Sequence, residues 1–133
     1  MITRAHLASR WRSLPADVIN QVTMYERHED SVYRPAEPMT VSAAAKRPLS
    51  KDEKSVFDNV KVNSERRSWH IWVETITAPW DTSFDPYSVE IVPDWIVKES
   101  NGDEWVVVAA DLGLLDTHWR CPCYLRWGAP LIP

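Results

Sequence analysis

Three residues near the carboxyl end of the chain have side chains that bind zinc in many proteins: His118, Cys121 and Cys123. A closed zinc site uses four ligands and usually includes two cysteines separated by two residues. Here Pro122 alone separates the pair, and the sequence has no other cysteines. On a β-strand, positions 121 and 123 point to the same face. The spacing therefore favours two buried thiols, and we expect no bound metal or other cofactor.

Nucleophilic catalysis needs a base held beside a nucleophile. The histidines that could serve as that base are His6, His28, His70 and His118. None lies in a Gly-x-Ser-x-Gly sequence, and a chain with three glycines contains no glycine-rich phosphate loop. The carboxylate pairs Asp103–Glu104 and Asp81–Asp85 fall in predicted turns, where solvation explains their charge. We therefore expect no enzymatic activity, and a metal-dependent enzyme built on residues 118–123 is the weakest alternative.

Eight tryptophans are the most unusual feature of the composition. Exposed indoles could stack against sugars or single-stranded bases, whereas a buried indole removes about 150–250 Å² of surface from water. The four that lie within predicted strands, and that we expect to fill the core, are Trp69, Trp95, Trp105 and Trp119. Trp80 and Trp127 lie near predicted turns, so we expect them to be exposed and to anchor a partner surface.

Short β-strands must position these side chains. Runs rich in β-branched and aromatic residues predict strands at residues 18–27, 56–62, 69–77, 92–98, 104–110 and 118–127. Asn101-Gly102 between two apolar runs is the strongest hairpin signal, because both residues tolerate positive φ. Residues 3–13 predict a short helix that ends before Pro15. The pattern predicts a mainly β fold, a small antiparallel β-barrel formed as one domain over residues 1–133.

Residues 28–55 differ from the rest of the chain, with three prolines, ten charged residues and few large apolar groups. They could bury too little surface to offset the entropy of ordering, so we expect a long flexible insertion loop. Ser50 and Glu53 have the spacing of a capping box, which predicts one helical turn near the end of this loop. Its basic residues, which could simply be solvated, are Arg34, Lys46, Arg47, Lys51 and Lys54.

Length and charge limit the classes of protein. A chain of 133 residues can remove roughly two-thirds of its extended surface from water, and no run approaches the ~18 apolar residues of a membrane span. The amino end lacks a secretory signal, so the expected compartment is the cytoplasm. Residues 58–133 contain six basic and twelve acidic residues, which argues against wrapping DNA. An acidic surface could instead line a channel through which a polyanion slides.

The order of these parts resembles one known family. A strand at 22–27 precedes the predicted loop, and the strand Trp69-His70-Ile71-Trp72-Val73 follows it. A polar turn then leads into residues 101–108, and His118-Trp119-Arg120-Cys121 forms the last strand. This layout resembles the head-closure proteins of tailed bacteriophages and prophages, also called head–tail joining or stopper proteins. In that family, a polar turn, an aromatic-valine strand and a closing strand commonly end a small β-barrel.

The resemblance implies a structural role in the virion. Copies of the protein would form a ring beneath the portal or adaptor, close the DNA-filled head, and offer a docking surface to the tail or tail-terminator protein. In such a ring, the five basic residues of the predicted loop could pair with acidic patches of neighbouring copies. The packaged double-stranded DNA would lie close to this ring only transiently. The implied location is the virion, and the host cytoplasm during assembly, without a membrane. The alternative is a β-sandwich module that binds carbohydrate through exposed tryptophans.

Overall fold

A computed structural model describes residues 10–15, 18–26, 38–58, 60, 64–79 and 81–126 of the chain. Its strands are β1 (Asn20–Tyr25), β2 (Met39–Arg47), β3 (Arg66–Trp72), β4 (Ile76–Thr77), β5 (Ile96–Glu99), β6 (Glu104–Val107), β7 (Asp111–Leu112) and β8 (His118–Leu125). The described helical segments are the α-helix α2 (Lys51–Lys54) and the 3₁₀ helices η1 (Arg10–Ser13), η2 (Ser55–Phe57), η3 (Val73–Thr75), η4 (Pro86–Ser88) and η5 (Leu114–Asp116).

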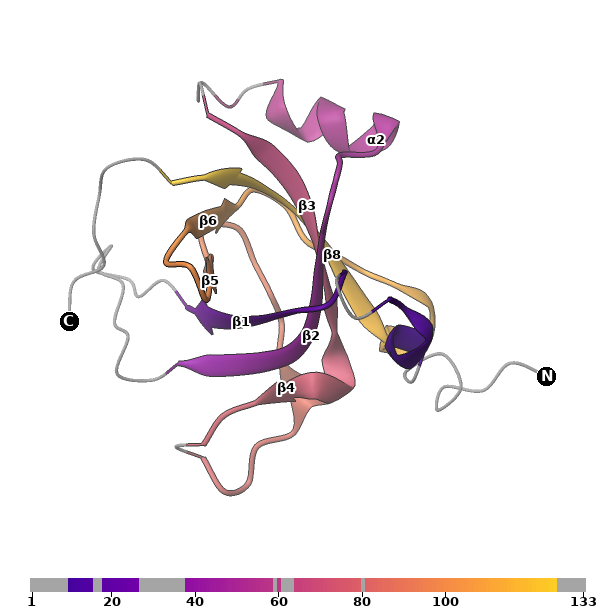
Figure 1. The fold of residues 1–133 in the computed structure, drawn as a ribbon, viewed down its shortest axis with the longest axis vertical. Helices are drawn as coiled ribbons and strands as arrows, with labels where there is room; N and C mark the ends of the chain where they lie inside the picture. The colour runs from indigo at the N-terminus through magenta and orange to yellow at the C-terminus, as the bar shows by residue number, and fades with distance from the viewer. Residues whose placement is uncertain are drawn as a thin grey trace.

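Six antiparallel strands close into a barrel in the order β1-β5-β6-β8-β3-β2, and β2 pairs back to β1 to complete the circle (Figure 1). The two shortest strands extend this barrel: β4 pairs with β2 beyond the end of β3, and β7 pairs with β8 beyond the end of β6. The prediction of a mainly β fold with a small antiparallel barrel is therefore confirmed.

Strand β2 corrects the prediction that residues 28–55 form a loop. Met39–Arg47 is the longest strand, and Ala43, Ala44 and Ala45 within it are at most 1% exposed. Small side chains suit this position, because β2 hydrogen-bonds to β1 along one edge and to β3 and β4 along the other. Pairing along both edges satisfies the backbone and favours an ordered strand despite the small apolar side chains. The first part of the predicted loop, residues 28–37, lies outside the described residues.

The helical turn predicted from Ser50 and Glu53 is confirmed. The Ser50 hydroxyl accepts a hydrogen bond from the Glu53 amide, and the Glu53 carboxylate accepts one from the Ser50 amide. This reciprocal pair satisfies two donors at the start of α2. The first residues of the strand predicted at 56–62 belong to η2 instead, where Phe57 is buried and Arg66 lies over its ring. Residues 59, 61 and 62 lie outside the described residues.

The other predicted boundaries hold within a few residues, except where the backbone turns. Strand β5 begins at Ile96 instead of residue 92, because Asp94 has a φ of 77° and interrupts the extended run. The run predicted at 69–77 begins at Arg66 and is divided by η3. The Asn101-Gly102 turn joins β5 to β6 as predicted, and Gly102 has a φ of 97°. Of the helix predicted at 3–13, residues 10–13 form η1 and the rest lies outside the described residues.

The barrel is filled by large apolar side chains from all six strands and from the long connection between β4 and β5. The prediction for four tryptophans is confirmed: Trp69 and Trp105 are fully buried, and Trp95 and Trp119 are 6% exposed. The rings of Trp69 and Trp105 meet edge to face, with centroids 6.3 Å apart. Indoles supply the bulk that this core, with few leucines, otherwise lacks.

Candidate interaction surfaces

The cysteine pair lies inside the barrel. Cys121 and Cys123 are both fully buried on the inner face of β8, as the alternation of side chains predicted. The Cys123 thiol donates to the backbone oxygen of Cys121 over 3.1 Å. Burial raises the pKa of both thiols, so both are protonated at neutral pH and make poor nucleophiles or metal ligands. Among the described residues, no group of three or more histidine, cysteine, aspartate or glutamate side chains is arranged to hold a metal ion.

Lys46 takes part in a half-buried cluster at one end of the barrel. Its ammonium group lies 3.3 Å from the Glu99 carboxylate and 5.4 Å from the centre of the Trp105 ring. The Trp105 indole donates to the same carboxylate over 2.8 Å. The Glu99 side chain is only 10% exposed, so the lysine and the indole compensate a carboxylate that has lost most of its water. The charge of Lys46 is thus paired with a carboxylate of the same chain, whereas the sequence left open a contact with a neighbouring subunit.

Three other basic residues of the predicted interface lie at the end of β2 and on the helix that follows it. Arg47 ends β2, and Lys51 and Lys54 lie on α2, all of them exposed. None of the three forms an ion pair with another described residue. We call these three residues the basic end. Its cations are exposed to solvent and could meet an anionic partner.

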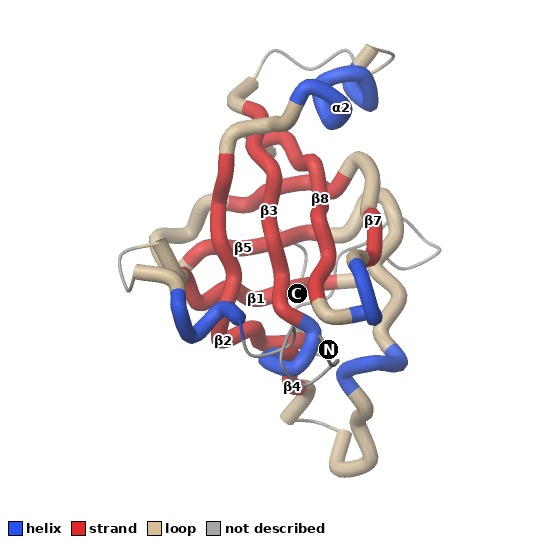
Figure 2. The backbone as a smooth tube through the Cα atoms, turned by 90° about the vertical axis from the view of Figure 1, so that its right-hand side faces the viewer, coloured by secondary structure: helices blue, strands red, loops and turns tan. Residues whose placement is uncertain are grey.

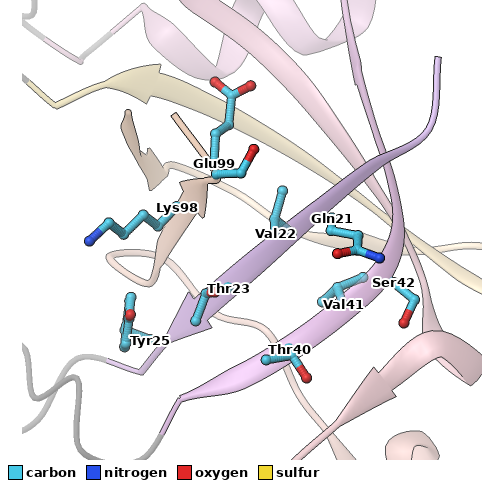
Figure 3. A pocket seen from close by; sticks show the side chains of 10 residues that line it. Gln21, Val22, Thr23, Tyr25, Thr40, Val41, Ser42, Lys98 and Glu99 are labelled. Carbon is cyan, nitrogen blue, oxygen red and sulfur yellow. The ribbon is translucent and has the colours of Figure 1, made fainter. Parts of the chain in front are cut away.

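A groove of about 460 Å³ runs over the outer surface of β1, β2 and β5 (Figure 3). Figure 3 shows the side chains of Gln21 and Thr23 on one side of β1 and that of Val22 on the other. The alternation of side chains along β1 explains this separation, because Val22 and Met24 serve the core. The residues that line the groove contain hydroxyl, amide and ammonium groups but no histidine or cysteine. The groove can therefore hydrogen-bond a partner, and it offers no histidine or cysteine for catalysis.

Three aromatic rings stack on the outer face of β3 and β8. The His118 ring lies between Trp72 and His70, with ring centroids 5.6 Å and 5.8 Å away and interplanar angles of 22° and 27°. The pairing of Trp72 with His118 across the two strands produces this stack. Gly113 also lies against the His118 ring, since an added Cβ would come within 3.0 Å of its Cε1. The histidines thus present their faces to other rings and do not converge on a metal.

The surroundings of the stack keep both histidines neutral. Burial, followed by the positive charge that His118 acquires when protonated and by the charges of Arg47 and Arg120, lowers the pKa of His70 to about 4, against the opposing effect of Glu53. Burial and the nearby Arg120 and Arg10 lower the pKa of His118, against the opposing effect of Asp111. For Glu53, burial raises the pKa, but hydrogen bonds from Ser68 and Ser50 outweigh it and lower the pKa.

These pKa shifts predict that acid destabilises the protein. As the pH falls from 7 to 5, the unfolded chain binds protons on histidines with an ordinary pKa of 6.5, whereas folded His70 remains largely neutral. We expect the free energy of unfolding to fall by about 1 kcal/mol over this range, after allowing for partial solvent access. Urea titrations at the two pH values measure it, and His70→Gln should reduce the difference. An unchanged difference in that variant would contradict the assignment to His70.

The long connection between β4 and β5, residues 78–95, carries four carboxylates, of which the sequence pointed only to Asp81 and Asp85, as solvated turn residues. Its carboxylates are Asp81, Asp85, Glu90 and Asp94, and no lysine or arginine occurs anywhere in residues 68–97. Asp81 is partly buried, and the other three are exposed. The signal that could have revealed this segment is the 30-residue interval without a cation. We call residues 78–95 the acidic loop.

The remaining predicted interface residues, Arg34, Trp80 and Trp127, lie outside the described residues. No protein-family model, curated protein or solved structure matches the chain. Within the described part of the chain, no helix is long and apolar enough to cross a membrane. The candidate surfaces are therefore the basic end, the acidic loop, the outer groove and the ring stack.

Proposed function

We propose that the protein is a structural component of a phage or prophage head–tail connector. In this role, copies of the chain form a ring that closes the DNA-filled head and docks the tail. The observation that carries the proposal is the way the barrel is completed. A polar turn joins β5 to β6, the Trp105-Val106-Val107 sequence forms β6, and β8 closes against it and β3. This is the layout on which the resemblance to head-closure proteins rests.

The distribution of polar groups also supports a binding role. Two exposed charged surfaces of opposite sign and a hydrogen-bonding groove lie on the outside of a tightly packed barrel. A rigid scaffold with polar outer surfaces suits a subunit that holds several neighbours at once.

The alternative, a carbohydrate-binding module, depends on exposed tryptophans. Four of the eight fill the core, and Trp72 stacks against His118. The two that were expected to be exposed, Trp80 and Trp127, lie outside the described residues. Nothing in the described part of the chain favours this alternative over the connector.

Deleting the gene from the phage or prophage genome that carries it tests the proposal. We expect DNA-filled heads without tails in negative-stain electron micrographs, together with loss of plaque formation, because the tail has no surface on which to dock. Wild-type protein supplied from a plasmid should restore tailed particles. Normal infectious particles after the deletion would reject the proposal.

A further inference from the structure

The negative charge of this protein is concentrated in one segment. Residues 68–97 contain five carboxylates and no lysine or arginine, whereas the rest of the chain contains 14 acidic and 15 basic residues. The rest of the chain thus has a formal charge of +1 against −4 for the whole. The barrel as a whole is not acidic, and the excess of carboxylates belongs largely to the acidic loop.

Contacts on both faces of the acidic loop hold it in a defined shape. Toward the barrel, Ile91 and Trp95 are buried, and Phe84 and Val89 pack against the core. Toward solvent, the Asp81 carboxylate accepts hydrogen bonds from the amide and hydroxyl of Ser83. Long loops that pack in this way are frequently binding elements, because their side chains are already positioned.

The outer side of this loop also exposes apolar groups. Tyr87 is 36% exposed and Val92 is 42% exposed, and both lie among the carboxylates. Apolar and aromatic side chains surrounded by charges are typical of protein interfaces, where burial contributes affinity and charge contributes orientation. The composition of this surface fits a protein partner that carries cations.

The cations that could meet this surface lie at the other end of the same molecule. In Figures 1 and 2, α2 lies at the top of the long axis, and the segment after β4 forms the bottom. The three cations of the basic end are equalled in number by Asp52, Glu53 and Asp58, but Glu53 is partly buried and accepts a hydrogen bond from Ser68, so the exposed charge is positive. Two copies placed end to end would bring opposite charges together, whereas two acidic loops would repel each other.

We propose that the acidic loop of one copy docks against the basic end of a second copy. Such a contact joins two different surfaces, so each subunit has one of each to offer, and repetition closes into a ring if the rotation between neighbours allows it. This inference deepens the proposed connector function, on which its ring form rests. The contact itself is a property of the chain alone and can be measured without a virion.

The first test is the concentration dependence of sedimentation of the purified full-length protein. In about 20 mM salt we expect weak reversible association, which roughly 0.5 M salt should abolish by screening. Substituting Lys51→Glu and Lys54→Glu should weaken association by about tenfold or more, since each exposed ion pair contributes modestly. The matched control is Arg10→Glu with Arg12→Glu, which changes the net charge equally on the exposed η1 and should associate like the wild type.

The second variant removes the charge of the acidic loop and preserves its turns. The substitutions are Asp81→Asn, Asp85→Asn, Glu90→Gln and Asp94→Asn. Asparagine retains the side-chain oxygens that accept from Ser83 and Tyr87, so the loop should keep its shape. This variant should also lose association. Thermal unfolding close to that of the wild type would verify that it is folded.

Mixing the two variants distinguishes an end-to-end contact from any symmetric one. The lysine variant keeps an intact acidic loop, and the loop variant keeps an intact basic end, so together they can form one productive contact. We expect a one-to-one complex that grows no further, although neither variant associates alone. Absence of this complex, equal loss of association in the control variant, or wild-type association in either variant would overturn the inference. These measurements on the purified protein do not depend on the particles seen after gene deletion. Either proposal can therefore be rejected while the other stands.

Discussion

Replacing Trp105 with alanine is expected to lower the free energy of unfolding by about 4 kcal/mol, a large part of the stability of an ordinary domain. The Trp105 ring is fully buried, meets Trp69 edge to face and lies beneath the ammonium group of Lys46. Its removal would therefore leave a cavity in the middle of the barrel and a half-buried carboxylate, that of Glu99, without its indole donor. Chemical denaturation followed by circular dichroism measures the loss.

Two further variants separate the contributions at this position. Trp105→Phe keeps much of the ring but cannot donate to Glu99, so its cost should be smaller than that of alanine and should reflect both lost volume and the lost hydrogen bond. Tyr87→Ala removes an aromatic ring that is 36% exposed, and it should change stability by no more than about 0.5 kcal/mol. A loss below about 1 kcal/mol in Trp105→Ala would contradict the central place of this indole.

Substituting Lys46→Met is expected to cost about 1–3 kcal/mol, the second largest effect. The substitution retains an apolar stem against Trp105 but leaves Glu99, whose side chain is 10% exposed, without its cation. A buried charge that loses its partner retains its cost of desolvation and loses the compensating attraction. Urea denaturation at pH 7 measures the change.

A double-mutant cycle with Glu99→Gln identifies the cause. Glutamine keeps an oxygen that can accept from the Trp105 indole but removes the negative charge. The pair Lys46→Met with Glu99→Gln should therefore be more stable than the sum of the single effects predicts. Strict additivity would mean that Lys46 and Glu99 do not interact in solution, and it would again make Lys46 available to a neighbouring subunit.

The cluster at Lys46 also changes which residues are expected to mediate assembly. A lysine already engaged with Glu99 and Trp105 contributes to the barrel, whereas exposed cations without an intrachain ion pair can engage a neighbour at little cost. Of the interface residues expected from sequence, the basic end is therefore the part that we expect to engage a neighbouring copy in the proposed contact. Its counterpart, the acidic loop, is of equal importance to the end-to-end contact.

Local sequence determined several features of this protein directly. The β5–β6 turn follows from Asn101 and Gly102, and the turn of α2 follows from Ser50 and Glu53, because each signal acts within a few residues. The burial of the cysteines and of the four core tryptophans follows from strand periodicity and from the area that an indole buries. These predictions needed no knowledge of which strands are neighbours.

Only the tertiary structure decided the features that depend on strand pairing. Residues 39–47 became a barrel strand because β1, β3 and β4 satisfy both of its edges, although its own side chains gave a weak signal. The ion pair of Lys46 with Glu99 joins residues 53 apart in the chain, and the stack on His118 depends on the register of β3 with β8. The physical reason is common to all of them: a contact between distant residues depends on a backbone arrangement that many segments stabilise together, and no short window of sequence contains it.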